Sequence, residues 1–391
     1  MMKKIFPILA LSIFSSLLGS GMIVPLLPLH AETMGATGIW LGAIVSGFSI
    51  AHAIATPFAG KLSDRIGRKI PLAAGLFTYA VISISFTWAD TVAQLSLIRL
   101  LQGISAGFII PLAQAYIGDI SPKAEEGKWM GYFNAIFFTG FGVGPLAGGV
   151  LSDHFGMNAA FYTMAGLNML AFLIVLFLLP ETTHKAIGIN QHISYRTISK
   201  SNMVRALFSF RLALALGRGA FATFLPIFAA LFLGLSPSLI GVLLAASILI
   251  MSLLQPLGGN IADKINRRGL IILGGVINIA FLGLIPLTRG FWPLLIVCTL
   301  GGISGGLAIP AASALVIEEG RKYGMGSTIA VFSMSFGIGM GTGPLLAGTI
   351  ADVVSVTAVF YFGAIVSLIG TIVFILFTRQ QHLDSKPAIY L

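Results

Sequence analysis

Charged residues are scarce in this chain. They make up 9% of its 391 residues, whereas ordinary soluble domains carry about 25%. Apolar residues make up 57% of the chain, and most of them fall in runs of about 20 residues, the length that a helix needs to cross a bilayer. The composition therefore excludes an ordinary soluble domain and predicts an integral membrane protein.

Several chemical signatures are also absent. The only cysteine is Cys298, so no disulfide within the chain is possible. The sequence contains no G-x-x-x-x-G-K-[ST] motif, no nucleophile–base arrangement and no metal-binding cluster of His, Cys and acidic residues. These absences argue against an ATP-driven pump and against an enzyme. We expect no catalytic residue, no metal and no cofactor.

Acidic residues are especially rare, with 13 acids against 23 bases. None lies in the middle of an apolar run: Glu32, Asp153 and Asp352 lie near outer ends, and Asp119 and Glu318 lie near inner ends. Because an unpaired charge is costly in an apolar medium, the missing acids are informative. They predict an interior between the apolar segments that is neutral or electropositive.

Twelve apolar segments organise the chain. They are 5–29, 38–59, 71–88, 92–116, 129–151, 157–180, 209–233, 237–258, 270–288, 291–317, 327–350 and 355–378. Each is predicted to be a helix, because lipid cannot satisfy backbone amides and runs this long lack the alternation of a barrel strand. The first could instead be a signal peptide, but no small-residue cleavage site follows it. The predicted fold class is an all-α integral membrane protein with twelve transmembrane helices.

Basic residues predict the orientation. If the N-terminus is cytoplasmic, every Lys and Arg except Arg99, Arg218 and Arg289 falls in a cytoplasmic segment. This bias predicts a multi-pass protein of a prokaryotic plasma membrane with both termini in the cytoplasm. It also explains the net charge of +10 through contact with anionic lipids, so we expect no nucleic-acid partner. We expect the protein to be a monomer.

An internal repeat divides the chain. At an offset of 199 residues, Pro57 matches Pro256 and Gly144 matches Gly343. The same offset relates Asp64 to Asp263, Arg68 to Arg267, Gly103 to Gly302 and Pro145 to Pro344. The repeat predicts two pseudo-symmetric six-helix halves, 1–180 and 209–391, joined by a polar cytoplasmic linker at 181–208; the second half ends in a short cytoplasmic tail. Parallel repeats of this kind are a known plan of secondary transporters, which bind substrate near the midplane.

Three motifs are similar to those of a known family. Residues 60–69 read GKLSDRIGRK, 95–106 read LSLIRLLQGISA, and 140–149 read GFGVGPLAGG. The first resembles the loop motif between helices 2 and 3 of the major facilitator superfamily, and the second resembles its helix-4 motif. The third resembles the helix-5 motif of the twelve-helix drug:proton antiporters within that superfamily.

The resemblance implies the major facilitator fold and a secondary active transporter that works by alternating access. It favours proton-linked efflux of small organic or drug-like compounds. One alternative is an importer or facilitator of a small metabolite such as an organic anion. A second alternative is a non-transporting membrane receptor or enzyme.

The resemblance also implies a conformational latch. Its residues are Gly60, Asp64, Arg65, Gly67, Arg68 and Asp119. Arg68 is expected to pair with Asp119, and Asp64 to lie near the N-terminus of the eleventh helix. In the second copy of the motif, GNIADKINRR at 259–268, Asn266 replaces the glycine, and we expect a left-handed backbone that asparagine tolerates. Alternatively, the bases of this segment only set the topology.

Glycines and a proline in the fifth segment predict a hinge. The residues are Gly140, Gly144, Pro145, Gly148 and Gly149, with Gly343 and Pro344 as symmetric partners. Glycines at four-residue spacing lie on one face of a helix and let another helix approach closely, while a proline removes a backbone hydrogen bond. One half is therefore predicted to rock against the other here. The alternative is tight packing with no moving part.

Ionisable residues inside apolar segments are the candidates for substrate binding and coupling. They are His52, Arg99 and Arg218, with Gln102, Gln114, Asn134 and Glu32 as further polar candidates. Alternatively, Arg99 anchors neighbouring carbonyls, Arg218 extends to the membrane interface and His52 only packs. Because no acid is available to pair with a cation, we predict neutral, amphipathic or anionic substrates, with protons as the coupling ion.

Overall fold

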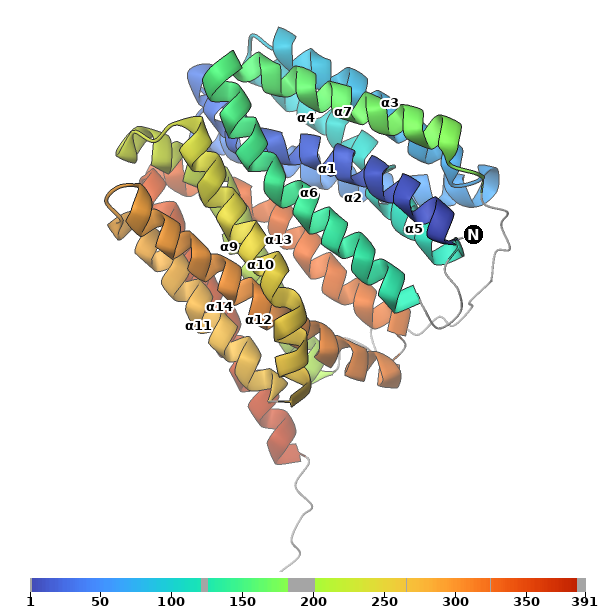
Figure 1. The fold of residues 1–391 in the computed structure, drawn as a ribbon. Helices are drawn as coiled ribbons and strands as arrows, with labels where there is room; N and C mark the ends of the chain where they lie inside the picture. Colours follow the sequence, from blue (N-terminus) through green and yellow to red (C-terminus); the bar gives the residue numbers. More distant parts are fainter. Residues whose placement is uncertain (1, 121–125, 182–200, 265, 324, 385–391) are drawn as a thin grey trace, which may run out of the picture. The chain divides into compact units, whose positions relative to one another are not determined.

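The structure is a computed structural model that describes residues 2–120, 126–181, 201–264, 266–323 and 325–384 (Figure 1). These residues form helices joined by short turns, with no strand among them. Twelve helical segments of the described chain are long and apolar enough to span a membrane. The predicted fold class and number of spans are therefore confirmed.

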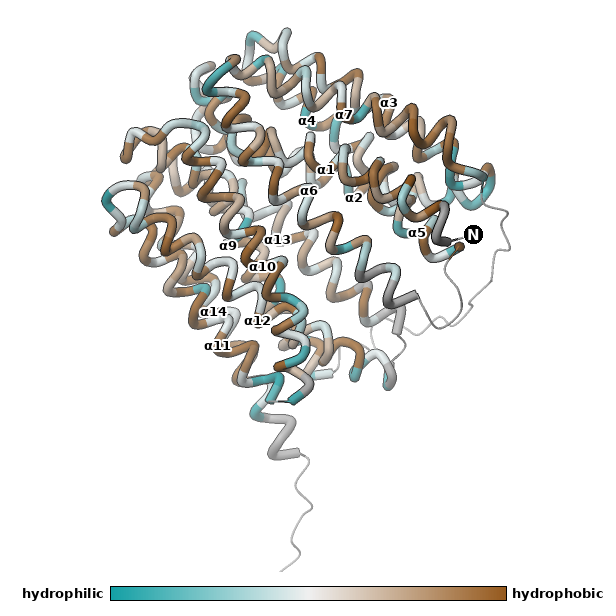
Figure 2. The backbone as a smooth tube through the Cα atoms, in the orientation of Figure 1, coloured by the Kyte–Doolittle hydropathy of each residue, from teal (hydrophilic) through white to brown (hydrophobic). Residues whose placement is uncertain are grey.

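The helices follow the predicted segments in order. The first half contains α1 (Met2–Thr33), α2 (Gly38–Ile66), α3 (Lys69–Ser85), η1 (Phe86–Trp88), α4 (Val92–Ala106), α5 (Ile110–Ile120), α6 (Glu126–Phe155) and α7 (Met157–Leu178). The second half contains α9 (Asn202–Leu233), α10 (Pro237–Lys264), α11 (Arg267–Leu284), η2 (Ile285–Leu287), α12 (Phe291–Tyr323), α13 (Met325–Val353) and α14 (Val356–Asp384). Figure 2 shows hydrophobic residues along the helices and hydrophilic residues gathered at their ends.

The fourth span is interrupted, although the sequence predicted one continuous helix at 92–116. It consists of α4 and α5, and the backbone between them forms tighter bonds, from Phe108 N to Ser105 O and from Ile109 N to Ala106 O, both 3.0 Å. Pro111 explains the interruption, because it has no N–H to donate to the preceding turn. Apolar composition alone does not reveal this break.

Several helices are longer than their apolar segments. α9 begins at Asn202 rather than at residue 209, so the last part of the predicted linker is helical and continuous with α9. The linker residues 182–200 lie outside the described part of the chain. Hydropathy marks the part of a helix that contacts lipid, whereas the helix itself continues as long as its backbone hydrogen bonds do.

The chain folds into two compact units. One contains Met1–Ile187 and Ala222–Leu249, and the other contains Gly188–Phe221 and Ile250–Leu391. In the first unit α1 packs against α6 and α7, α3 packs against α7, and α2 packs against α4. In the second unit α11 packs against α12 and α14, and α13 contacts the same two helices. Large apolar side chains such as Leu253 and Phe177 remain exposed, as lipid-facing surfaces require.

Candidate functional site

The motif at residues 60–69 is mainly helical, so the expectation of a loop was wrong. α2 continues to Ile66 and α3 begins at Lys69, which leaves only Gly67 and Arg68 between the two helices. The polar side chains of this stretch ended the apolar run, but polar residues at a helix end are fully compatible with continued backbone hydrogen bonding.

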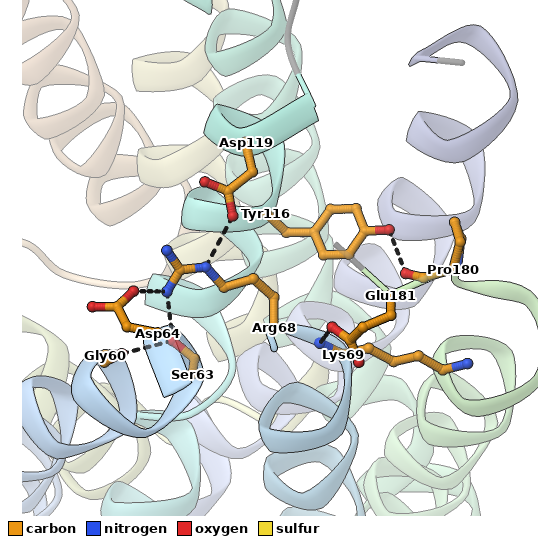
Figure 3. A network of polar contacts seen from close by, with 9 residues as sticks. All are labelled: Gly60, Ser63, Asp64, Arg68, Lys69, Tyr116, Asp119, Pro180 and Glu181. Atoms are coloured by element: carbon orange, nitrogen blue, oxygen red, sulfur yellow. Dashed lines mark hydrogen bonds and ion pairs between the residues drawn. The ribbon is translucent and has the colours of Figure 1, made fainter. Parts of the chain in front are cut away.

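Arg68 connects the end of α2 to the end of α5. Its Nε donates to Asp119 Oδ2 at 3.0 Å, which is the predicted pair (Figure 3). Its Nη1 donates to Ser63 Oγ and lies next to Asp64 Oδ1, both at 2.6 Å. The Arg68 side chain is 12% exposed, against 33% for Asp119 and 59% for Asp64. Asp119 is thus the more shielded of the two carboxylates that contact Arg68, and shielding from water strengthens an ion pair.

The turn between α2 and α3 requires glycine and receives a carboxylate. Gly67 has a φ of 99°, which strains any residue with a side chain. Glu181 Oε1 accepts a hydrogen bond from Lys69 N at 3.1 Å, at the positive N-terminal end of α3 (Figure 3). Nearby, the Tyr116 hydroxyl donates to Pro180 O at 2.7 Å. The sequence alone does not predict these contacts, because they join positions far apart in the chain.

The other predicted latch residues have lesser contacts. Gly60 O accepts from Ser63 Oγ at 2.8 Å, and a side chain at Gly60 would meet nothing within 4 Å. Arg65 is exposed. The predicted position of Asp64 at the eleventh helix would join the two compact units, and it stays a prediction.

The second copy of the motif forms an equivalent ion pair. Arg267 Nη1 donates to Glu318 Oε1, and both residues lie 199 positions after Arg68 and Asp119. The backbone at Asn266 differs from the expectation: its φ is −58°, and its side chain caps α11 by accepting from Arg268 N at 3.0 Å. The left-handed prediction for Asn266 was therefore wrong, because a capping side chain changes which backbone conformation is favoured there.

The glycine stripe of α6 packs against α1 within the first compact unit. A Cβ added at Gly144 would lie 2.5 Å from Gly21 Cα, and Gly140 and Gly148 also face the backbone of α1. In the second unit, a Cβ added at Gly343 would lie 2.5 Å from Leu216 O of α9. Close helix approach is thus present in both units.

Two further hinge residues make their own contacts. Pro344 packs against Gly219 of α9, where a Cβ added to the glycine would lie 2.9 Å from Pro344 Cδ. A Cβ added at Gly149 would lie 2.9 Å from Ser238 Cα of α10, which belongs to the same compact unit. Because the stripe itself joins helices inside one unit, rocking at this position stays a prediction.

Arg99 is buried inside the first unit. It is 9% exposed, and its Nη1 donates to Gln102 Oε1 at 2.6 Å. Its guanidinium lies 4.3 Å from the centre of the Phe48 ring, and Gln102 Nε2 donates in turn to Met164 Sδ at 3.7 Å. Among the described residues, Arg99 Nε has no hydrogen-bond partner. The side chain therefore keeps an unused donor.

Tyr79 extends this polar group to α1. It is 2% exposed, its hydroxyl accepts from Ser20 Oγ at 2.9 Å, and it lies near Arg99. Tyr79 was not predicted from the sequence, because an aromatic residue in an apolar run gives no signal except its hydroxyl.

His52 lies beside the same aromatic ring. Its ring stacks on Phe48 with 6.3 Å between centroids and 16° between planes. His52 is half-buried, and its Nε2 is one of the buried atoms without a partner in the described chain. The imidazole thus has a free nitrogen, as proton exchange requires.

The remaining polar candidates are dispersed. Gln114 is half-buried on α5, Asn134 is exposed on α6, and Glu32 is half-buried in the last turn of α1. The structure gives none of them a hydrogen bond to Arg99 or His52 within the described residues.

Arg218 points into the second unit rather than along its own helix. Its Nη1 donates to Met251 Sδ at 2.8 Å, and its Nη2 donates to Gly301 O at 3.4 Å. At the offset of 199, Gly301 corresponds to Gln102, which accepts a hydrogen bond from Arg99, and Met251 corresponds to His52, which stacks on the Phe48 ring. A guanidinium thus contacts the matched position in each unit, Gln102 or Gly301, and comes from α4 in one and from α9 in the other.

Arg211 lies within a candidate membrane-spanning helix, although the sequence predicted a cytoplasmic position for it. It lies within α9, and its guanidinium lies 5.2 Å from the Phe332 ring and 4.7 Å from the Phe336 ring. Arg211 is only two residues inside the predicted apolar segment 209–233 and was counted with the cytoplasmic bases at its end. In the structure α9 begins at Asn202, nine residues before Arg211.

Comparisons with known proteins agree with this architecture. The sequence profile described as Major Facilitator Superfamily matches residues 9–228 and 207–389. The Multidrug resistance protein 2 of Bacillus subtilis is 29% identical over 385 residues, covering 94% of each chain. The Quinolone resistance protein NorA of Staphylococcus aureus is 28% identical over 388 residues, covering 98% of each chain.

Solved structures share the fold at lower identity. A bacterial homologue of the human lysosomal transporter Spinster has a TM-score of 0.81 and 15% identity, with 98% of each chain covered. The human organic anion transporter MFSD10 has a TM-score of 0.67 and 20% identity, covering 95% of this chain and 99% of its own. With its twelve membrane-spanning helices and a family profile that matches nearly its whole length, this chain belongs to the Major Facilitator Superfamily of transporters.

Proposed function

We propose that this protein exports small organic or drug-like compounds by proton-linked alternating access. The observation that carries the proposal is the full-length similarity to relatives named for multidrug and quinolone resistance. The helix-5 motif supports it, since its glycines bring α6 against α1 at backbone distance. Close, smooth helix contacts allow one helix to slide on another with little repacking.

The proposal includes a topology. Both termini would be cytoplasmic in the plasma membrane, because nearly all bases then lie on the cytoplasmic side. The monomer would be the working unit. In this orientation the pairs Arg68–Asp119 and Arg267–Glu318 lie at cytoplasmic helix ends.

These ion pairs would act as the latch. An exposed pair contributes about 0–1 kcal/mol, and a carboxylate at a helix N-terminus contributes about 0.3–1 kcal/mol. Contributions of this size are enough to shift the populations of two conformations by several-fold. Breaking both pairs during opening would therefore change the rate of the cycle without unfolding the protein.

Coupling would involve the polar group around Arg99. His52 has a buried, unpartnered nitrogen and stacks on Phe48, and Arg99, which has an unused Nε, contacts the same ring. A proton held on His52 would add a second positive charge near Arg99, and the two charges would repel. Proton binding could in this way favour one conformation over another.

A second candidate function is an importer or facilitator of organic anions. Arg218 favours it, because its partners in the structure are a thioether and a long carbonyl contact rather than a carboxylate. Thioether sulfur is a weak acceptor, so the guanidinium keeps donors for an anionic ligand.

Inside-out vesicles test both functions. Vesicles holding the purified protein would be given an acid interior, and uptake of matched anionic, neutral and cationic fluorescent compounds would be followed. The exporter predicts uptake that stops when the proton gradient is collapsed. Uptake of organic anions that does not respond to the gradient would favour the facilitator, and no uptake of any class would contradict both.

A further inference from the structure

Two arginines of α9 lie on one face of the helix. Arg211 and Arg218 are seven residues apart, which is close to two complete turns, or about 10.5 Å along the axis. Both are only partly exposed, and they repel each other electrostatically. The apolar part of the second compact unit therefore holds two positive charges on one side of one helix.

The Arg211 guanidinium packs against two aromatic rings of α13. Phe332 and Phe336 are four residues apart, so both rings lie on the same side of their helix. The guanidinium lies within 5.2 Å of each ring centroid, where cation–π attraction is significant. Aromatic faces leave the donor edges of a guanidinium free. Arg211 Nε is buried and has no hydrogen-bond partner among the described residues.

Arg218 also has unused capacity. Its two acceptors are Met251 Sδ and Gly301 O, and the guanidinium occupies the space that a side chain at Gly305 would fill. The missing side chain at Gly305 of α12 thus leaves room for the Arg218 guanidinium. Its hydrogen bonds to Met251 and Gly301 use only part of its five N–H donors.

Neither arginine is paired with a carboxylate in the described part of the chain. The acids of α12 already have partners: Glu318 pairs with Arg267, and Glu319 pairs with Lys322 and accepts from Ser201 Oγ. Two cations without counter-ions are costly in an apolar environment. A ligand that brings two negative charges would remove that cost at both positions.

We propose that the second compact unit binds organic dianions, with one acid group at Arg218 and the other at Arg211. The two guanidinium groups contact different helices, Arg211 facing α13 and Arg218 facing α10 and α12. The acid groups must therefore be well separated, and a long dicarboxylate fits better than a short one. The proposal names a substrate class for the exporter proposed above. It rests on that function only in taking the dianion to be a ligand of the transporter.

The test is a thermal-unfolding titration of the full-length protein in detergent. The probes are suberate, succinate, octanoate and the monomethyl ester of suberate. We expect suberate to raise the unfolding temperature most, because a ligand that binds only the folded protein stabilises it. Succinate, octanoate and the ester should bind roughly tenfold more weakly, since each forms only one of the two charged contacts. This comparison needs no variant.

Variants locate the site. In Arg211→Gln the advantage of suberate over octanoate should disappear, while octanoate still binds through Arg218. Arg289→Gln removes the same charge from a segment outside α9 and serves as the matched control. Equal binding of suberate and its monomethyl ester to the wild type would overturn the proposal, as would an equal loss in Arg289→Gln.

The outcome is separable from that of the transport assay. Suberate binding that depends on Arg211 would stand even if vesicles showed no proton-linked export, and the proposed function would then fail alone. Proton-linked export together with equal binding of dianion and monoanion would refute the dianion site alone.

Discussion

Replacing Gly144 by alanine is the sharpest test of how closely α1 and α6 pack. The added Cβ would lie 2.5 Å from Gly21 Cα and 2.7 Å from both Gly21 C and Leu18 O. Carbon atoms in contact prefer about 3.5–4.0 Å, so the helices must separate by about 1 Å. All three obstructing atoms belong to the backbone, and no rotamer change can relieve the contact.

The expected loss of stability in Gly144→Ala can be judged from the cost of overpacking other protein cores. Forcing extra atoms into a well-packed core costs about 1–3 kcal/mol, against a gain of about 1 kcal/mol when glycine becomes alanine in a helix. We expect Gly144→Ala to lower the unfolding temperature in detergent and to slow transport, and Gly144→Leu to abolish transport. Gly343→Ala should behave like Gly144→Ala, because its Cβ would lie 2.5 Å from Leu216 O.

Two open glycines provide matched controls. A Cβ at Gly166 of α7 or at Gly337 of α13 would meet nothing within 4 Å. Alanine at either position should leave the unfolding temperature unchanged or raise it slightly. If Gly144→Ala proved as stable and as active as Gly166→Ala, the close packing of α1 on α6 would be refuted.

Four further predictions follow from the site. In a double-mutant cycle of Arg68→Gln and Asp119→Asn, unfolding free energies should reveal a coupling of about 0.5–1 kcal/mol, and additive effects would mean that the pair contributes nothing. Asp64→Asn should slow vesicle transport with nearly normal membrane insertion; wild-type turnover would reduce the motif to a topology signal. His52→Gln should give folded protein whose transport no longer responds to a proton gradient, whereas a retained response would leave His52 a packing residue. Gly305→Ala should displace the Arg218 guanidinium and weaken binding of octanoate, while Gly283→Ala, whose Cβ would lie 3.9 Å from Ala364, should not; equal binding to both variants would contradict the placement of Arg218.

The sequence determined the features that depend on composition and on the repeat. Long apolar runs between charged clusters specify membrane helices, because lipid tolerates no other backbone arrangement in a single run. The offset of 199 residues relates the two halves, and it also relates the ion pairs Arg68–Asp119 and Arg267–Glu318. The pair of Arg68 with Asp119 was predictable, because the family resemblance implies it.

Only the tertiary structure decided which polar groups meet. Helix ends extend beyond the apolar runs, so Arg211 lies nine residues inside α9 and the motif at 60–69 is mostly helical. The interruption of the fourth span and the conformation of Asn266 depend on local hydrogen bonds that composition does not record. Tyr79 with Ser20, and Arg211 with two phenyl rings, join residues far apart in the chain. Such contacts depend on which faces of the helices pack together, and hydropathy along a single chain carries no information about those faces.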